Sequence, residues 1–353
     1  MPQEINNNGI INNNNHLHED SKVDNNDINK QNKEFENEQN EVKPQVNENK
    51  NEETEEEEEE IVEDVEDEQV EQTEQEEQAE QEGGRKMRIG AVSLRGRRLT
   101  NEDEHVSILK LTENTSYFAV FDGHGGRFAS SYCKEKLHEN IIVSEHWPED
   151  VNTSLIDAFV ETNASYEEYG KEDGTTAVVA LLVNDTLHVA NLGDSRCLLI
   201  DENGNVEPLT RDHKPNLEDE KERIIASGHE VTSEMVLLNG KQTIMYRIDD
   251  IIACSRSIGD SSFKDNDDLP PEEQAVTCVP EIREFKVHSG QFLLLGCDGL
   301  FDVLSNEQVA EFIHSAWKTE QDLNLISSLL ANEAIQQGSD DNVSVLIVKI
   351  DSL

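Results

Sequence analysis

The sequence predicts an α+β fold built on antiparallel sheets. Short β-rich runs occur in pairs along the chain, at 105–111, 116–122, 175–183 and 186–192. Helical patterns also come in pairs, whereas a parallel α/β fold would alternate strands with helices. The two residues that connect the second pair of strands, Asn184-Asp185, have the length of a tight hairpin, which joins antiparallel strands.

The remaining elements follow from local patterns, taken in chain order. Residues 87–94 alternate apolar and polar side chains and predict the first strand. Two apolar runs, 117–121 and 292–296, predict buried strands, and 342–350 predicts a strand at the end of the chain. Apolar residues at helical spacing predict four amphipathic helices, over 126–140, 151–169, 306–318 and 323–337.

The first 82 residues differ in composition from the rest of the chain. They contain 29 acidic and 5 basic residues and one aromatic residue, and they change from an Asn-rich part into a Glu/Gln-rich part. A segment with so few apolar side chains cannot bury enough surface to offset the entropy lost on ordering. We therefore predict a disordered acidic tail over 1–82 and one folded domain over 83–353, which is long enough to bury a core.

Charge and cysteine content argue against several classes of protein. The chain has a net charge of −48 and no basic cluster, so we expect no nucleic-acid partner. It has no run of 18 apolar residues that could span a membrane, and no secretory signal. Its five cysteines form no C-x-x-C pair, so we expect no disulfide framework, no structural zinc site, and a reducing cytoplasmic or nuclear location.

The most informative feature is the placement of the carboxylates. Asp122-Gly directly follows the apolar run 117–121, and Asp298-Gly follows 292–296 with one residue between them. A single Asp-Gly after a strand is usually a turn, but several carboxylates at neighbouring strand ends repel one another unless a cation lies between them. Mg²⁺ and Mn²⁺ prefer oxygen ligands, so the sequence predicts a site for such ions. The carboxylates placed in this way are Asp122, Asp194, Asp298 and Asp341, with Glu102 and Asp103 nearby.

The motifs that contain these residues resemble those of the metal-dependent protein serine/threonine phosphatases of the protein phosphatase 2C family. The resemblance covers residues 87–353, and its specificity comes from eight motifs that occur in the family's order. They are RLTNED (98–103), FAVFDGHGG (118–126), GTTA (174–177), NLGDSR (191–196), LTRDHKP (209–215), SRSIGD (255–260), CDGLFDV (297–303) and DDNVS (340–344). Residues 211–260 correspond to the family's variable flap over the site.

The resemblance implies a four-layer α-β-β-α sandwich of two antiparallel sheets flanked by helix pairs, with a dinuclear Mg²⁺ or Mn²⁺ centre at one end. Asp122 resembles the carboxylate that bridges both ions, and the carbonyl of Gly123 lies beside it. Asp298 and Asp341 resemble the ligands of one ion. Glu102 corresponds to the residue that holds the other ion, largely through waters.

The remaining matches complete the site that the resemblance implies. Asp103 corresponds to a supporting carboxylate, and Asp194 to the residue that, with Asp298, admits a weaker third ion. Arg98 matches the arginine that binds the substrate phosphate, and His124 the candidate general acid. The domain over 83–353 is therefore expected to be a catalytic domain that acts on phosphorylated proteins as a monomer.

These residue types suit the hydrolysis of a phosphate ester. Two metal ions can bind one water and lower its pKa toward neutrality, which replaces a protein nucleophile and a phosphoenzyme intermediate. A planar guanidinium matches two phosphoryl oxygens at once, as Arg98 could. A serine or threonine alkoxide leaves poorly unless it is protonated, and a histidine such as His124, with an ordinary pKa near 6.5, is a suitable donor.

Other functions compete with this one. A nuclease or small-molecule phosphatase could use the same carboxylates, but the acidity of the chain disfavours a nuclease. An inactive scaffold that binds phosphoproteins would be expected to lose a carboxylate at 122, 298 or 341, and all three are present. A cysteine-dependent phosphatase needs C-x₅-R spacing, and none of the five cysteines has it.

Overall fold

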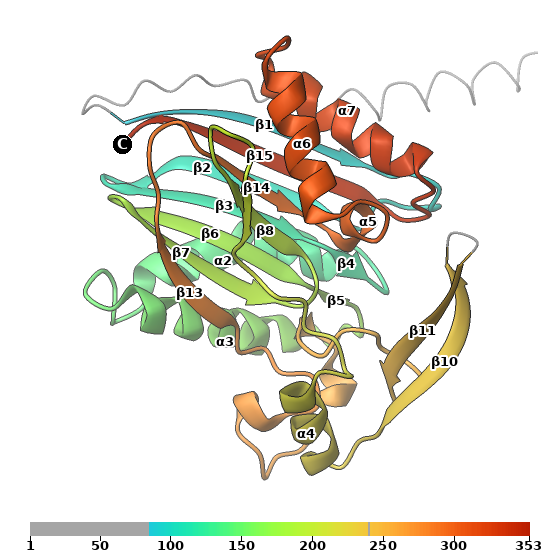
Figure 1. Ribbon diagram of the computed structural model, residues 1–353. Helices are drawn as coiled ribbons and strands as arrows, with labels where there is room; N and C mark the ends of the chain where they lie inside the picture. The colour runs from blue at the N-terminus through green and yellow to red at the C-terminus, as the bar shows by residue number, and fades with distance from the viewer. Residues whose placement is uncertain (1–84, 239–240) are drawn as a thin grey trace, which may run out of the picture. The chain divides into compact units, whose positions relative to one another are not determined.

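The computed structural model describes residues 85–238 and 241–353, so the tail predicted over 1–82 lies outside the described residues. Two five-stranded antiparallel sheets form the centre of the described part (Figure 1). In spatial order, the first sheet contains β1 (Lys86–Leu94), β15 (Val343–Ser352), β14 (Phe292–Gly296), β8 (Arg196–Ile200) and β9 (Val206–Pro208). The second contains β13 (Glu281–Lys286), β7 (Thr186–Leu192), β6 (Ala177–Val183), β3 (Thr115–Phe121) and β2 (Glu104–Thr112).

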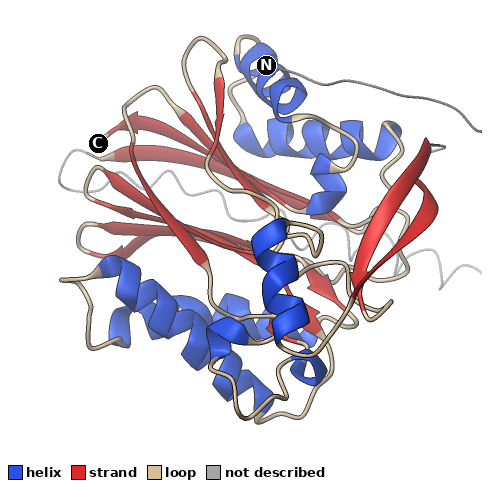
Figure 2. Cartoon of the chain, turned by 60° about the horizontal axis from the view of Figure 1, so that its bottom comes forward, coloured by secondary structure: helices blue, strands red, loops and turns tan. Residues whose placement is uncertain are grey.

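Three apolar cores hold four layers together. The core between the sheets combines side chains of both, such as Phe118 and Val178 from the second sheet and Leu295 and Val348 from the first. The outer face of the second sheet packs on α2 (Phe128–Val143) and α3 (Val151–Glu167). The outer face of the first packs on α5 (Asp298–Phe301), α6 (Asn306–Trp317) and α7 (Leu323–Gln336), as Figure 2 shows from a second side. This arrangement confirms the predicted α+β class and its α-β-β-α layers.

Local sequence signals set the ends of these elements. The β6–β7 hairpin turns at Asn184-Asp185 as predicted, and Asn184 has the positive φ of 54° that such tight turns require. Helix α6 begins with a capping box in which the side chains of Ser305 and Gln308 bond each other's backbone N–H groups. The run predicted as one strand over 175–183 is divided at Thr176, whose N–H donates to the carbonyl of Asp122 at 2.9 Å.

That division belongs to a short third sheet, with the order β12 (Ile258–Gly259), β5 (Gly174–Thr175) and β4 (Gly123–His124). It lies next to the segment that resembles the family's flap. That segment contains α4 (Glu218–Ala226) and a hairpin of β10 (Val231–Leu238) and β11 (Lys241–Ile248), which stands away from the two large sheets in Figure 1.

A buried ion cluster fixes the flap to the site. Glu220 of α4 is fully buried and accepts hydrogen bonds from Arg256 Nη2 at 2.5 Å and from Ser255 Oγ at 2.7 Å. Burial alone would raise the pKa of Glu220, but these bonds and the charges of Arg256 and Arg223 lower it to about 2. The cluster therefore anchors the start of the SRSIGD segment, which ends at Asp260 beside the short third sheet.

All five cysteines are free and buried in the described part of the chain. Among the described helices, none is both long and apolar enough to cross a membrane.

Candidate active site

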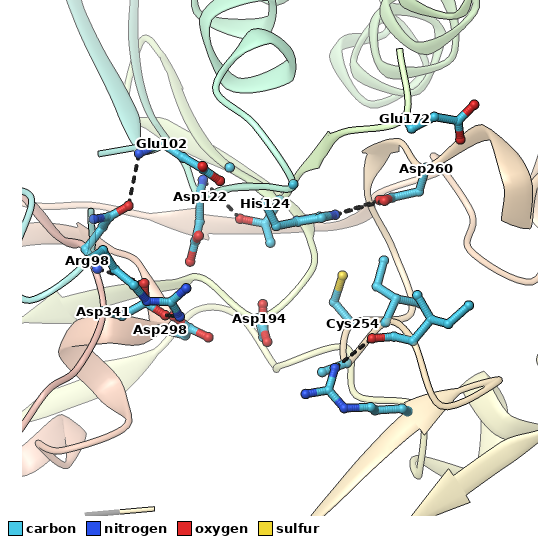
Figure 3. A pocket seen from close by; sticks show the side chains of 18 of the residues that line it. Arg98, Glu102, Asp122, His124, Glu172, Asp194, Cys254, Asp260, Asp298 and Asp341 are labelled. Atoms are coloured by element: carbon cyan, nitrogen blue, oxygen red, sulfur yellow. Dashed lines mark hydrogen bonds and ion pairs between the residues drawn. The ribbon is translucent and has the colours of Figure 1, made fainter. Parts of the chain in front are cut away.

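One cavity of about 800 Å³ lies where strands of both large sheets end (Figure 3). Asp122 follows β3, Asp194 follows β7, Asp298 follows β14, and Asp341 precedes β15. The sequence-predicted residues that line this cavity are Arg98, Glu102, Asp122, Gly123, His124, Asp194, Asp298 and Asp341. The ninth predicted residue, Asp103, is buried behind them. The fold thus brings together carboxylates that are as much as 239 positions apart in the sequence.

Glycine follows two of these aspartates because the backbone packs too closely for a side chain. A Cβ at Gly123 would lie 2.4 Å from the carbonyl oxygen of Glu102. A Cβ at Gly299, after Asp298, would lie 2.0 Å from the carbonyl oxygen of Asn342. Both distances are far inside van der Waals contact, so glycine is what allows the strand ends to bring their carboxylates together.

The buried carboxylates oppose one another's ionisation. Burial and then the charges of Asp298 and Asp103 hold the pKa of Asp122 well above its usual range. Burial and then the charge of Asp194 do the same to the pKa of Asp298. Burial raises the pKa of Asp103 to about 6, although Ser344 Oγ donates to its carboxylate at 2.7 Å. A cluster with this much unbalanced negative charge fits bound cations.

The atoms that could bind a cation indicate which kind of cation would suit this site. One ligand atom each from Asp103, Asp122 and Cys297 lies within 4.8 Å of the others. The Cys297 sulfur, however, accepts from the Ser344 N–H at 3.1 Å, and burial holds the pKa of its thiol well above the usual range. Apart from this sulfur, the donors of the group are carboxylate oxygens, the kind of donor that Mg²⁺ and Mn²⁺ prefer.

Arg98 stands at the rim of the cavity with its side chain 58% exposed. Its Nη2 donates to Asp341 Oδ2 at 2.6 Å and its Nε to the carbonyl of Asp340 at 3.2 Å. These two bonds fix the direction of the guanidinium, which has five N–H donors in all. Arg98 is thereby oriented by the same loop that supplies a carboxylate to the cavity.

A second basic group, Lys214, was not predicted from the sequence. Its Nζ donates to Asp194 Oδ2 in a short ion pair. The neighbouring His213 is fully buried, and its Nδ1 accepts from the Gly193 N–H at 3.1 Å. Residues of the LTRDHKP motif therefore hold the loop that carries Asp194 in place. The sequence alone did not show this structural role of the motif.

Asp260 is a further functional candidate that sequence reasoning missed. The His124 Nε2 lies 2.8 Å from Asp260 Oδ2 and 3.0 Å from its Oδ1, and Figure 3 shows this pair at one side of the cavity. The Asp260 side chain is 8% exposed and also accepts from Ser257 Oγ. Burial alone would lower the pKa of His124, but the charge and hydrogen bond of Asp260 outweigh it, so that the pKa is raised. The sequence did contain one sign that Asp260 belongs to the site, because Asp260 is the last residue of the SRSIGD motif.

Comparisons with known proteins place the chain among phosphatases. The model of the protein phosphatase 2C family matches residues 87–343. A protein of Oryza sativa subsp. japonica named "Probable protein phosphatase 2C 42" is 34% identical over 299 residues, which cover 73% of this chain and 82% of that protein. "Protein phosphatase 2C homolog 2" of Schizosaccharomyces pombe is 34% identical over 286 residues, which cover 75% of this chain and 74% of that protein.

A solved structure gives the same result for the fold. The crystal structure of a phosphatase from Toxoplasma gondii superimposes with a TM-score of 0.66 and 26% sequence identity. The match covers 75% of this chain and 92% of that chain. The likeness therefore includes nearly the whole of that phosphatase and most of the described residues here.

Proposed function

This chain belongs to the protein phosphatase 2C family of serine/threonine protein phosphatases, and we propose that it hydrolyses its phosphoprotein substrates at a dinuclear Mg²⁺ or Mn²⁺ centre. The family is metal-dependent. The observation that carries the proposal is that carboxylates from both sheets line one cavity together with Arg98 and His124. When bound, a pair of such ions would supply an activated water and neutralise charge on the phosphoryl group, without a phosphoenzyme intermediate.

The proposed ligand set is the one that the family resemblance implies, and its residues lie in or beside the cavity. We assign the bridging position to Asp122, with the Gly123 carbonyl beside it, one ion to Asp298 and Asp341, and the other to Glu102. Asp103 supports Asp122 from behind. Asp194 is assigned to a weaker third ion, and its ion pair with Lys214 supports this weakness, because a cation there has to compete with the ammonium group.

The protein's own groups would then perform two further tasks. Arg98, held by the Asp340-Asp341 loop, would bind phosphoryl oxygens at the rim of the cavity. His124 would donate a proton to the departing serine or threonine oxygen, and Asp260 would fix the imidazole and stabilise its protonated form. We further propose that the enzyme acts as a monomer in the cytoplasm or nucleus, with no nucleic-acid or membrane partner.

Phosphate release from a phosphothreonine peptide tests this function directly. With the full-length chain, we expect release in millimolar Mn²⁺ or Mg²⁺, loss of release in excess EDTA, and recovery when Mn²⁺ is restored. Undiminished release in EDTA would rule out the metal centre. An absence of release with either metal would contradict the proposed activity.

Arg98→Ala is expected to raise KM about tenfold or more for a phosphopeptide and for an aryl phosphate alike, since the phosphate contact does not depend on the leaving group. The measurement is steady-state kinetics on both substrates. Arg97→Ala is a matched control, because Arg97 is also exposed and pairs with Asp340 Oδ1 at 2.7 Å outside the cavity lining. Equal increases in KM for the two variants would contradict a specific role of Arg98 in phosphate binding.

Asp260→Asn is expected to move the alkaline limb of the kcat profile to lower pH and to reduce kcat at pH 7 about tenfold. The sign follows from the raised pKa of His124: Asp260 keeps the imidazole protonated at higher pH, and asparagine does so less well. The profile is measured with a phosphopeptide between pH 5 and 9. An unchanged profile would mean that Asp260 has only a structural role.

A further inference from the structure

The cavity has an apolar half that the proposed chemistry does not use. Besides the carboxylates, its lining includes 251–254 and Phe263 on the flap side, and Leu99 next to Arg98. Leu99 is 93% exposed and Ile251 is 65% exposed, although both belong to the lining of the cavity. A partner bound in the cavity would cover both of these exposed apolar side chains.

The structure holds Ile251 in this exposed place by a strained turn. Asp249 and Asp250, which precede it, have φ values of 51° and 61°, in a region that residues other than glycine rarely adopt. Two consecutive residues of this kind persist only where surrounding contacts over-determine them, and such strain is concentrated at functional sites.

Those contacts are present on both sides of the turn. The Asp249 carboxylate bonds His229 Nδ1 at 2.6 Å and the Glu230 N–H at 2.9 Å. On the other side, Arg247 Nη1 donates to the carbonyl of Ile251 at 2.6 Å. The Ile251 side chain is therefore presented at the cavity from a fixed backbone.

Phosphoprotein substrates must bring their phosphate to this same cavity. Leu99 directly follows Arg98, and consecutive Cα atoms are about 3.8 Å apart, so Leu99 lies within reach of the residues that flank a phosphate held by Arg98. Ile251 reaches the same cavity from the opposite wall. A substrate segment between them would bury both side chains and gain most if its own flanking side chain were apolar.

We propose that Leu99 and Ile251 form an apolar clamp that selects phosphoserine and phosphothreonine sites with a large apolar residue within two positions of the phosphoresidue. The clamp rests on the proposed function, since it requires that the phosphate is bound at Arg98 and the carboxylates. It adds a specificity that the catalytic residues, which contact only the phosphate and the leaving oxygen, do not provide.

The test compares two phosphothreonine peptides that differ only at the positions flanking phosphothreonine, with leucine in one and serine in the other. Both residues are neutral, so the acidic Glu172 in the lining does not influence the comparison. With the full-length chain and Mn²⁺, we expect kcat/KM for the leucine peptide to be at least about fivefold higher. In Leu99→Ser and in Ile251→Ser, the ratio should fall below about twofold.

Met235→Ser is the matched control. Met235 is 66% exposed on the β10–β11 hairpin, about as much as Ile251, but it is not among the described residues that line the cavity. The ratio should be unchanged in this variant. The side chains of Leu99 and Ile251 are exposed, so their truncation leaves the core intact, and thermal midpoints equal to wild type verify this.

The possible outcomes distinguish a failure of the clamp proposal from a failure of the proposed function. If the wild-type enzyme hydrolyses p-nitrophenyl phosphate and both peptides with Mn²⁺ but with equal kcat/KM for the peptides, the clamp is wrong and the phosphatase function stands. The clamp is also wrong if Met235→Ser lowers the ratio as much as Ile251→Ser. If no substrate releases phosphate with Mn²⁺, the proposed function itself fails, and the clamp fails with it.

Discussion

Asp122→Asn is expected to lower kcat/KM for a phosphopeptide at least about a thousandfold, a loss of about 4 kcal/mol of transition-state stabilisation, while making the metal-free protein more stable. The two effects have one cause. The Asp122 carboxylate lies among other buried carboxylates, where we propose that it binds cations, and without cations its charge opposes folding. Asparagine has nearly the same shape and no charge, so it removes both the ligand and the repulsion.

The pH dependence of stability follows from the raised pKa values. A carboxyl group whose pKa is higher in the folded than in the unfolded protein stabilises the fold below the unfolded pKa, and this stability is lost as the pH rises through the folded pKa. For Asp103 the loss falls between about pH 4 and pH 6. Asp122 and Asp298 add losses of the same sign. Metal-free wild-type protein should therefore become less stable as the pH rises, and Asp122→Asn should flatten this trend.

Thermal unfolding in EDTA from pH 4 to pH 8, together with kcat/KM in Mn²⁺, measures both effects. Asp268→Asn is a suitable control, because Asp268 is exposed and outside the cavity lining, so neither quantity should change. A variant at 122 that kept its activity, or one that was less stable than wild type without metal at pH 7, would contradict the assignment of Asp122.

The sandwich was largely predictable from the sequence because its elements have strong local signals. The apolar runs of β3 and β14 and the two-residue turn at Asn184-Asp185 each indicate a local structure without reference to the rest of the chain. The flap elements lack such signals. Helix α4 has only nine residues, with charged residues in its first turn and only two buried residues, and the β10–β11 hairpin forms a separate two-stranded sheet, so neither buries a broad apolar face.

The site was predictable to the extent that each residue has its own motif. What the motifs could not show is which groups pair across them. Lys214 and Asp194 are 20 positions apart, and His124 and Asp260 are 136 apart, so each pair exists only after the chain has folded. Ile251 was missed for another reason, since an exposed isoleucine in a sequence is indistinguishable from a buried one.

His124→Ala is expected to slow kcat for phosphoserine peptides by roughly two to four orders of magnitude, the usual contribution of general acid catalysis. A serine alkoxide is a poor leaving group, so its departure needs the proton that the imidazole supplies. The loss should be much smaller for p-nitrophenyl phosphate, whose leaving group is stable without a proton. The difference between the two substrates, measured as a ratio of kcat losses, is what identifies a proton donor.

His146→Ala provides the matched control for this experiment. His146 Nδ1 also pairs with an aspartate, Asp157 Oδ2, at 2.8 Å, but the pair is exposed and outside the cavity lining. Both variants therefore lose a histidine–aspartate pair, but only His124→Ala removes a histidine that lies near Asp122. We expect His146→Ala to retain wild-type kcat on both substrates.

We expect His124 and Asp260 to act together, because they are in contact. His124 belongs to the DGHGG turn, two positions after the proposed bridging carboxylate, and its Nε2 pairs with Asp260 at the end of the flap segment. If this contact matters for proton transfer, removing Asp260 in a protein that already lacks His124 should cause little further loss. A double variant His124→Ala/Asp260→Asn with kcat equal to His124→Ala supports this coupling, whereas losses that multiply would mean that Asp260 acts through other contacts, such as its bond from Ser257.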